Sequence, residues 1–169
     1  MLLCYYGAMS INKLVVIIRY ALGGGGLYFA LTQLKSDPTN AAAIASMTAV
    51  GCVGVLSFVT HVLLHEQDAK RIGFETKTVS FQYEVGFANL AFGLSAIVSY
   101  VAHWGVQADT ILIFGYALYL LQAGMLHTAK SLKGKKKDIT HFIRGGIITF
   151  VFSGAMLYLV AQVVTSSAF

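Results

Sequence analysis

Five long apolar runs constrain the fold of this 169-residue chain more than any other feature. They cover Leu14–Leu34, Ala41–Leu64, Val79–Val101, Thr110–Leu126 and Ile139–Val164. A helix needs about 20 apolar residues to cross a bilayer, and the run from Thr110 approaches that length if it continues through His127 and Thr128. A backbone in lipid must satisfy its own hydrogen bonds, as a helix does. The runs therefore predict an all-α fold, a polytopic transmembrane helical bundle of five spans with a four-helix core plus one helix.

Composition and the connections between the runs indicate a membrane protein of one domain. Charged residues make up 11% of the chain and hydrophobic residues 57%, whereas soluble domains have about 25% charged residues. The connections are KSDPTN, HEQDAKRIGFETK, HWGVQAD and SLKGKKKD, all too short for a soluble domain. Asp37 and Pro38 in the first connection predict a turn and a helix start. The chain starts without a basic n-region, so no signal peptide is expected, and residues 1–169 are predicted to form a single transmembrane domain.

Lysine and arginine are unevenly distributed between the two ends of the predicted bundle. The richer end carries Lys13, Lys70, Arg71, Lys77, Lys130, Lys133, Lys135, Lys136 and Lys137. The opposite end has Lys35. Because cytoplasmic loops carry an excess of positive charge, we expect the N-terminus in the cytoplasm and the C-terminus outside. The Lys133–Lys137 segment could also bind anionic lipid headgroups of the bilayer. No nucleic-acid partner is expected, because the basic residues flank membrane spans, and a homo-oligomer is left open.

The third run opens with SFQYEVGFANLAFG, which places a carboxylate and two amides inside a predicted span. Polar groups at such positions are costly in lipid and normally face protein or a watery cavity. On a helix, one face carries Gln82, Gly86, Asn89 and Gly93, and another carries Glu84, Ala88, Ala91 and Ser95. Both faces are small or polar, which predicts a helix packed on more than one side. The alternative is that Glu84, near the helix start, is solvated at the membrane interface.

Glycine is frequent within the spans. The first run contains Gly23–Gly26 in series, the second contains Gly51 and Gly54, and the fifth contains three more glycines. Small residues let membrane helices approach closely, which is the expected role here. Four consecutive glycines could alternatively loosen the first helix and open its carbonyls to a ligand.

Histidine, glutamate and arginine side chains gather at one end of the predicted bundle. Alternating helix direction brings the end of the second span, the start of the third and the end of the fourth to similar depth. We predict ligand-binding residues there: Arg19, His61, Gln82, Glu84, Asn89 and His127. Two imidazoles and a carboxylate suit a divalent metal such as zinc or iron, so His61, Glu84 and His127 are the candidate metal ligands. The same groups would suit a proton relay, or a hydrogen-bonded network with no further role, and haem held by His61 and His127 is a weaker alternative.

The middle of the chain resembles a family of uncharacterised bacterial integral-membrane proteins. The matching features are His61, Asp68-Ala69, the IGF of Ile72–Phe74, the FQYEVGFANLAFG of Phe81–Gly93 and the GMLH of Gly124–His127. In that family the pattern runs roughly GH, D, A, IGW, FQxEVGFANL and GH. Three residues depart from this pattern: Thr60 and Leu126 stand where the family has glycine, and Phe74 stands where it has tryptophan. The layout is more distantly similar to DoxX-like membrane proteins, some of which are linked to quinone redox chemistry. The resemblance implies the fold, a bacterial inner membrane and the choice of His61, Glu84 and His127 as site residues, and it leaves the reaction open.

Three classes of function follow from these features. The first is a small membrane protein that binds a metal ion or small ligand at the cytoplasmic end, either as a binding protein or as a redox or other membrane enzyme. The second is a small transporter, or a proton- or ion-conducting protein, that uses the same residues. The third is a structural subunit whose polar side chains only pack.

Overall fold

The computed structural model describes residues 10–72, 79–133 and 142–166, and these form helices joined by short turns. The helices are α1 (Ile11–Gln33), α2 (Pro38–Ala45), η1 (Ser46–Cys52), α3 (Val53–Phe58), η2 (Val59–Leu63), α4 (His65–Ile72), α5 (Ser80–Val101), α6 (Val106–Lys133), η3 (Phe142–Ile147) and α8 (Ile148–Thr165). The η segments are π-helical turns, so α2 to η2 form one nearly continuous span. The first nine residues and most of the Lys133–Lys137 segment lie outside the described residues.

Five of the described segments are long and apolar enough to cross a membrane. They are Ile11–Gln33, Pro38–Leu63, Ser80–Val101, Val106–Leu132 and Gly145–Thr165. The predicted all-α bundle of five spans is therefore confirmed. The chain is a small membrane protein, as its apolar helices indicate.

Local signals fix where several helices begin. Asp37 caps α2 by accepting a hydrogen bond from Asn40 N at 2.9 Å, and Pro38 occupies the first turn, as predicted. The turn between α5 and α6 contains Gly105, whose φ of +95° favours glycine. Across this turn, Ser99 Oγ donates to Asp109 Oδ1 at 2.9 Å, and both side chains are buried. This hydrogen bond joins the end of α5 to the start of α6.

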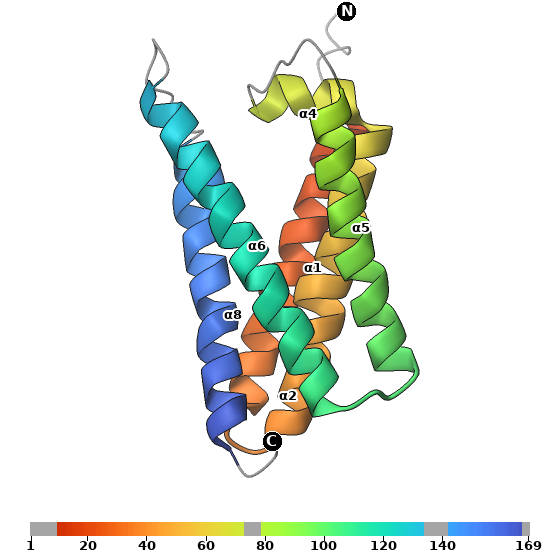
Figure 1. Ribbon diagram of the computed structural model, residues 1–169, viewed down its shortest axis with the longest axis vertical. Helices are drawn as coiled ribbons and strands as arrows, with labels where there is room; N and C mark the ends of the chain where they lie inside the picture. Colours follow the sequence, from red (N-terminus) through yellow and green to blue (C-terminus); the bar gives the residue numbers. More distant parts are fainter. Residues whose placement is uncertain (1–9, 73–78, 134–141, 167–169) are drawn as a thin grey trace, which may run out of the picture.

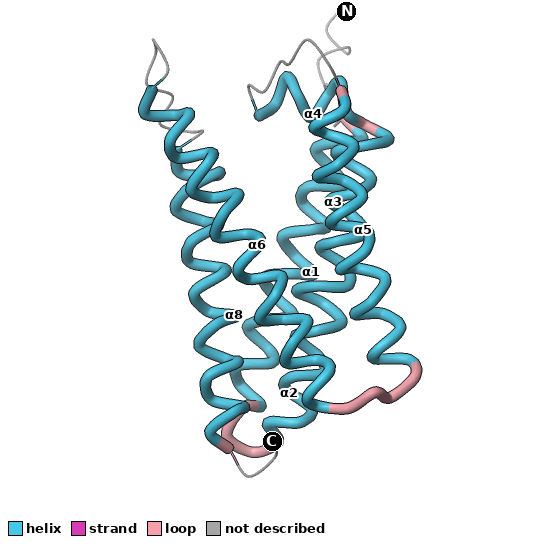
Figure 2. Tube along the Cα trace, in the orientation of Figure 1, coloured by secondary structure: helices cyan, strands magenta, loops and turns pink. Residues whose placement is uncertain are grey.

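The helices form two groups that meet at one end and diverge at the other. Helices α6 and α8 pair with each other, and α5 packs against η1 and α3, which also contact α1 (Figure 1). Figures 1 and 2 show the two groups separating toward the end that carries α4. The buried core lies in the opposite half, where both groups contribute: Leu27, Ala30, Val50, Ala96, Ile113, Tyr116, Met156, Leu159 and Val163. One half of the bundle is thus closely packed, while the helices of the other half separate.

Glycine permits the closest approach of the second span to α5. A Cβ added to Gly54 would lie 2.8 Å from Gly93 Cα, and one added to Gly93 would lie 2.8 Å from Val55 N. Backbone therefore meets backbone here, as the small-residue pattern predicted. In α1 the helix continues through the four glycines, and Gly24 and Gly25 face open space.

One face of α5 follows the prediction and the other follows it only in part. Gln82, Gly86, Asn89 and Gly93 are all buried. On the second face Glu84 and Ala91 are exposed while Ala88 and Ser95 are partly buried, so this face is packed only in part and Glu84 follows the alternative of a solvated side chain. The physical reason is that the second span covers only the face that carries the glycines.

Candidate functional site

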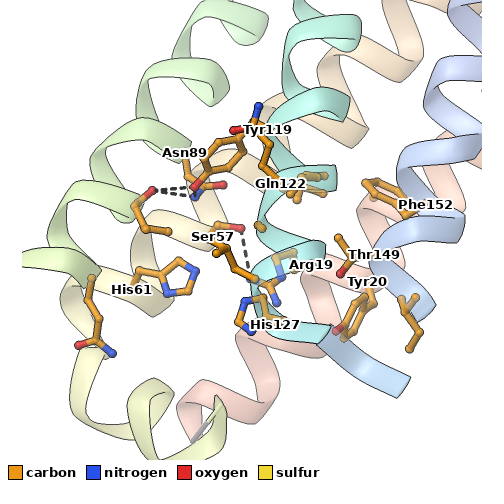
Figure 3. Close-up of a pocket in the computed structure, with 18 of the residues that line it drawn as sticks. Arg19, Tyr20, Ser57, His61, Asn89, Tyr119, Gln122, His127, Thr149 and Phe152 are labelled. Atoms are coloured by element: carbon orange, nitrogen blue, oxygen red, sulfur yellow. Dashed lines mark hydrogen bonds between the residues drawn. The ribbon is translucent and has the colours of Figure 1, made fainter. Parts of the chain in front are cut away.

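A cavity of about 440 Å³ lies between the two helix groups in the half of the bundle that carries α4 (Figure 3). Residues of α1, α3, η2, α5, α6 and α8 line it. Its volume falls in the range of about 300–1,000 Å³ typical of small-ligand sites. Most of the surface that lines the cavity is apolar. The polar residues of the lining are Arg19, Tyr20, Ser57, His61, Gln82, Asn89, Tyr119, Gln122, His127 and Thr149.

His61 is held at the cavity by a buried carboxylate. Its Nδ1 lies 2.8 Å from Asp68 Oδ2, and Asp68 is 0% exposed. The second span ends at Leu64, whose φ of −114° and ψ of 27° are not helical, and α4 then carries Asp68 back toward His61. The hydrogen bond of one ring nitrogen sets the tautomer of a histidine. With Nδ1 next to the Asp68 carboxylate, Nε2 is the nitrogen available to a ligand.

Arg19 is the residue with a fixed positive charge among the described residues that line the cavity. It lies eight residues into α1, about 12 Å along the helix axis from Ile11. Its side chain is half-buried, Nη1 donates to Ser57 Oγ at 3.2 Å, and the guanidinium carbon lies 5.6 Å from the centre of the Tyr20 ring. The arginine therefore points toward the second span. Figure 3 shows it entering the same cavity as His61 and His127.

His127 reaches the cavity from the last turns of α6. It packs against η3, where a Cβ added to Gly145 would lie 2.9 Å from His127 Cβ. Glycine at this position is what lets η3 approach the imidazole. Short π-helical turns occur frequently at functional sites, and here η2 carries His61 while η3 supports His127.

Asn89 forms hydrogen bonds at the end of the cavity that lies nearest the packed half of the bundle. Its Nδ2 donates to Val85 O at 2.7 Å and to Tyr119 Oη at 2.8 Å, and its Oδ1 accepts from Tyr116 Oη at 2.7 Å. Both ends of the amide are thereby satisfied, as a buried amide requires. Tyr116 is fully buried, and its ring stacks on Tyr119 with centroids 5.8 Å apart. This network closes the cavity toward the packed half.

Comparison with known proteins assigns the chain to a family but not to an activity. The model of a family of unknown function, DUF6790, matches residues 15–167. The chain belongs to this family. No curated protein and no solved structure matches it. The resemblance to an uncharacterised family is thus confirmed, while bacterial origin and likeness to DoxX proteins stay predictions.

The structure places five of the six predicted ligand-binding residues around one cavity. These are Arg19, His61, Gln82, Asn89 and His127. The exception is Glu84, which is exposed and does not line the cavity. Successive helical residues turn by about 100°, so Glu84 points about 200° away from Gln82, which is buried.

The expected metal triad of His61, Glu84 and His127 is not formed in the structure. In the described parts of the chain, no group of three or more histidine, cysteine, aspartate or glutamate side chains is placed to hold a metal ion. The reason is the outward direction of Glu84, together with the engagement of His61 by Asp68.

Several residues of this site were missed by the sequence reasoning. Ser57 lies four residues before His61, a spacing that places both on one helix face. Tyr116 and Tyr119 have the corresponding spacing of three within the fourth span. These spacings could have indicated the residues. No local signal indicated Asp68 as the partner of His61, because their contact depends on the break at Leu64.

Proposed function

We propose that this protein binds a small amphiphilic ligand in the cavity between the α6–α8 pair and the other spans. The observation that carries the proposal is a cavity of about 440 Å³ whose mostly apolar wall holds polar side chains from several helices. A protein interior is ordinarily close-packed, with few voids larger than a water molecule. A bundle whose polar residues only packed together would have no need of such a space. The structural-subunit alternative is therefore less well supported.

Binding is better supported than conduction. Beyond Asn89, the described residues fill the bundle with buried side chains, including Tyr116, Ile113 and Met156, which are each 0% exposed. The cavity thus ends part-way through the bundle in this conformation. A transporter or ion path would require this packed half to open.

A second candidate, a membrane enzyme that uses His61 as a general acid or base, is favoured by the Asp68 contact. A carboxylate on one nitrogen of an imidazole fixes the tautomer and presents the other nitrogen to a substrate. The distance of 2.8 Å between His61 Nδ1 and Asp68 Oδ2 is short enough for such a pair. We place the site at the cytoplasmic end of the membrane-spanning bundle, in a bacterial inner membrane. The distribution of lysine and arginine and the family resemblance support this placement.

The test uses a cavity-filling variant and a matched control on the same helix. Gly24 lines the cavity and Gly25 does not, and a Cβ added at either position meets nothing within 4 Å. Gly24→Phe should fill the cavity, Gly25→Phe should leave it open, and both should fold. The probe is a neutral dodecanol that bears a photoreactive diazirine, presented in phosphatidylcholine nanodiscs.

Cross-linked peptides from the unmodified protein should contain cavity residues such as Tyr20 or Phe152. This labelling should be lost in Gly24→Phe and kept in Gly25→Phe. Equal labelling of the two variants, or labelling spread evenly over the lipid-facing surface, would contradict the proposed function.

A further inference from the structure

The charge of the cavity wall is unbalanced. Arg19 is permanently charged, and none of the described lining residues is acidic. The buried carboxylate of Asp68 lies outside the lining and within hydrogen-bond distance of His61. Glu84 is exposed on another face of α5. The described residues of the wall therefore include one fixed cation, Arg19, and no carboxylate to balance it.

Most of the hydrogen-bonding capacity of Arg19 is left to a ligand. A guanidinium carries five N–H donors, and within residues 10–72, 79–133 and 142–166 one of them is used, on Ser57 Oγ. A charged group inside a membrane span is costly, and such groups normally pair or face a cavity. The inward hydrogen bond to Ser57 directs this arginine toward the cavity. A ligand with a negative oxygen group would supply the missing acceptors and the missing charge.

We propose that the ligand is an amphiphile with a single carboxylate, which Arg19 binds while the chain of the ligand occupies the apolar part of the cavity. This inference rests on the proposed function. A planar guanidinium matches a carboxylate with two parallel hydrogen bonds. One arginine balances one carboxylate, whereas a phosphate monoester carries a charge of about −1.5 to −2.

The rest of the wall fits an apolar chain. Val53, Leu120, Ile148 and Phe152 line the cavity from three helices, α3, α6 and α8. Leu126 also lines it and is 60% exposed, so the wall is continuous with the outer, lipid-facing surface of α6. An apolar chain can therefore remain in contact with protein or lipid along its length. A small free carboxylate would leave these residues uncovered.

The experiment compares four probes in phosphatidylcholine nanodiscs at about pH 8, above the ordinary pKa of a carboxylic acid. The probes are dodecanoate, dodecanol, dodecyl phosphate and acetate. Equilibrium dialysis measures binding, and empty nanodiscs correct for partition into lipid. Dodecanoate should bind most tightly, and acetate should show no saturable binding. Equal binding of dodecanoate and dodecanol, tighter binding of dodecyl phosphate, or saturable binding of acetate would overturn the proposal.

Variants of the arginine identify the group responsible. Arg19→Gln should weaken dodecanoate binding by about ten- to a hundredfold, the range of a charge-assisted hydrogen bond, and leave dodecanol binding nearly unchanged. Arg19→Lys keeps the charge and should keep a preference for dodecanoate over dodecanol. Lys13→Gln removes an exposed charge of the same helix outside the cavity and should change neither affinity. Equal loss of both ligands in Arg19→Gln would also contradict the proposal.

Failure of this inference differs from failure of the proposed function. If dodecanoate and dodecanol bind alike and Gly24→Phe blocks both, the cavity binds ligands but Arg19 does not select a carboxylate. If Gly24→Phe blocks neither ligand, the cavity is not the binding site and both proposals fall. If Arg19→Gln does not fold, the four-probe comparison on the unmodified protein and on Arg19→Lys still decides the question.

Discussion

Replacing Gly93 by alanine should destabilise the bundle, because its new methyl group would meet backbone. An added Cβ would lie 2.8 Å from Val55 N and 3.0 Å from Gly51 O, distances that require the second span or α5 to shift. Overpacking of this kind costs about 1–3 kcal/mol. Alanine also improves helix propensity over glycine by about 0.8–1.0 kcal/mol, which partly offsets the loss.

A matched control removes the propensity contribution. Gly154 also lies inside a spanning helix, and a Cβ there would meet nothing within 4 Å. Gly154→Ala should therefore stabilise the protein by the propensity gain alone. The free energies of unfolding of the two variants should differ by about 1–3 kcal/mol, with Gly93→Ala the less stable.

The measurement is unfolding by sodium dodecyl sulfate in mixed micelles, followed by circular dichroism. Both variants are compared with the unmodified protein under the same detergent conditions. If Gly93→Ala and Gly154→Ala have the same stability, the close backbone contact between α5 and the second span does not exist as described.

Two further predictions address the hydrogen-bond network and the topology. Tyr116→Phe removes the donor to Asn89 Oδ1 and should lower the free energy of unfolding by about 1–3 kcal/mol, whereas Tyr28→Phe, at a residue 71% exposed, should change it by less than about 0.5 kcal/mol. Equal effects of the two would mean that the network contributes nothing to stability. In cells, Gly134→Cys should be protected from a membrane-impermeant thiol reagent and Ala168→Cys should react, and the opposite pattern would reverse the predicted orientation.

Periodicity and length were sufficient to predict the architecture. Runs of about 20 apolar residues identified the spans, because a helix of that length crosses the bilayer. A helix also satisfies its own backbone hydrogen bonds, which lipid cannot do. The spacing of Gln82, Gly86, Asn89 and Gly93 identified the buried face of α5, because residues at helical spacing share a side. Arg19 and His127 were correctly expected near one another in depth, since neighbouring spans run in opposite directions.

The sequence could not show which of two similar faces is buried. Both faces of α5 are small or polar, and Glu84 was assigned to the site although its side chain is exposed. Packing against the glycines of the second span decides between them, and that is a tertiary effect. The contact of His61 with Asp68 likewise depends on a single non-helical residue, Leu64. The hydrogen bond that the Tyr116 hydroxyl donates to Asn89 depends on the approach of α6 to α5.

The division of the bundle into a packed half and a hollow half makes its two membrane faces unequal. The cavity ends at Asn89, near the middle of α5, and its exposed wall at Leu126 lies toward the end that carries α4. A molecule dissolved in the bilayer would therefore reach the cavity beside Leu126, from the leaflet that surrounds the half of the bundle carrying α4. Any ligand that enters laterally is drawn from that single leaflet, so its supply depends on how the membrane distributes the ligand between its two sides.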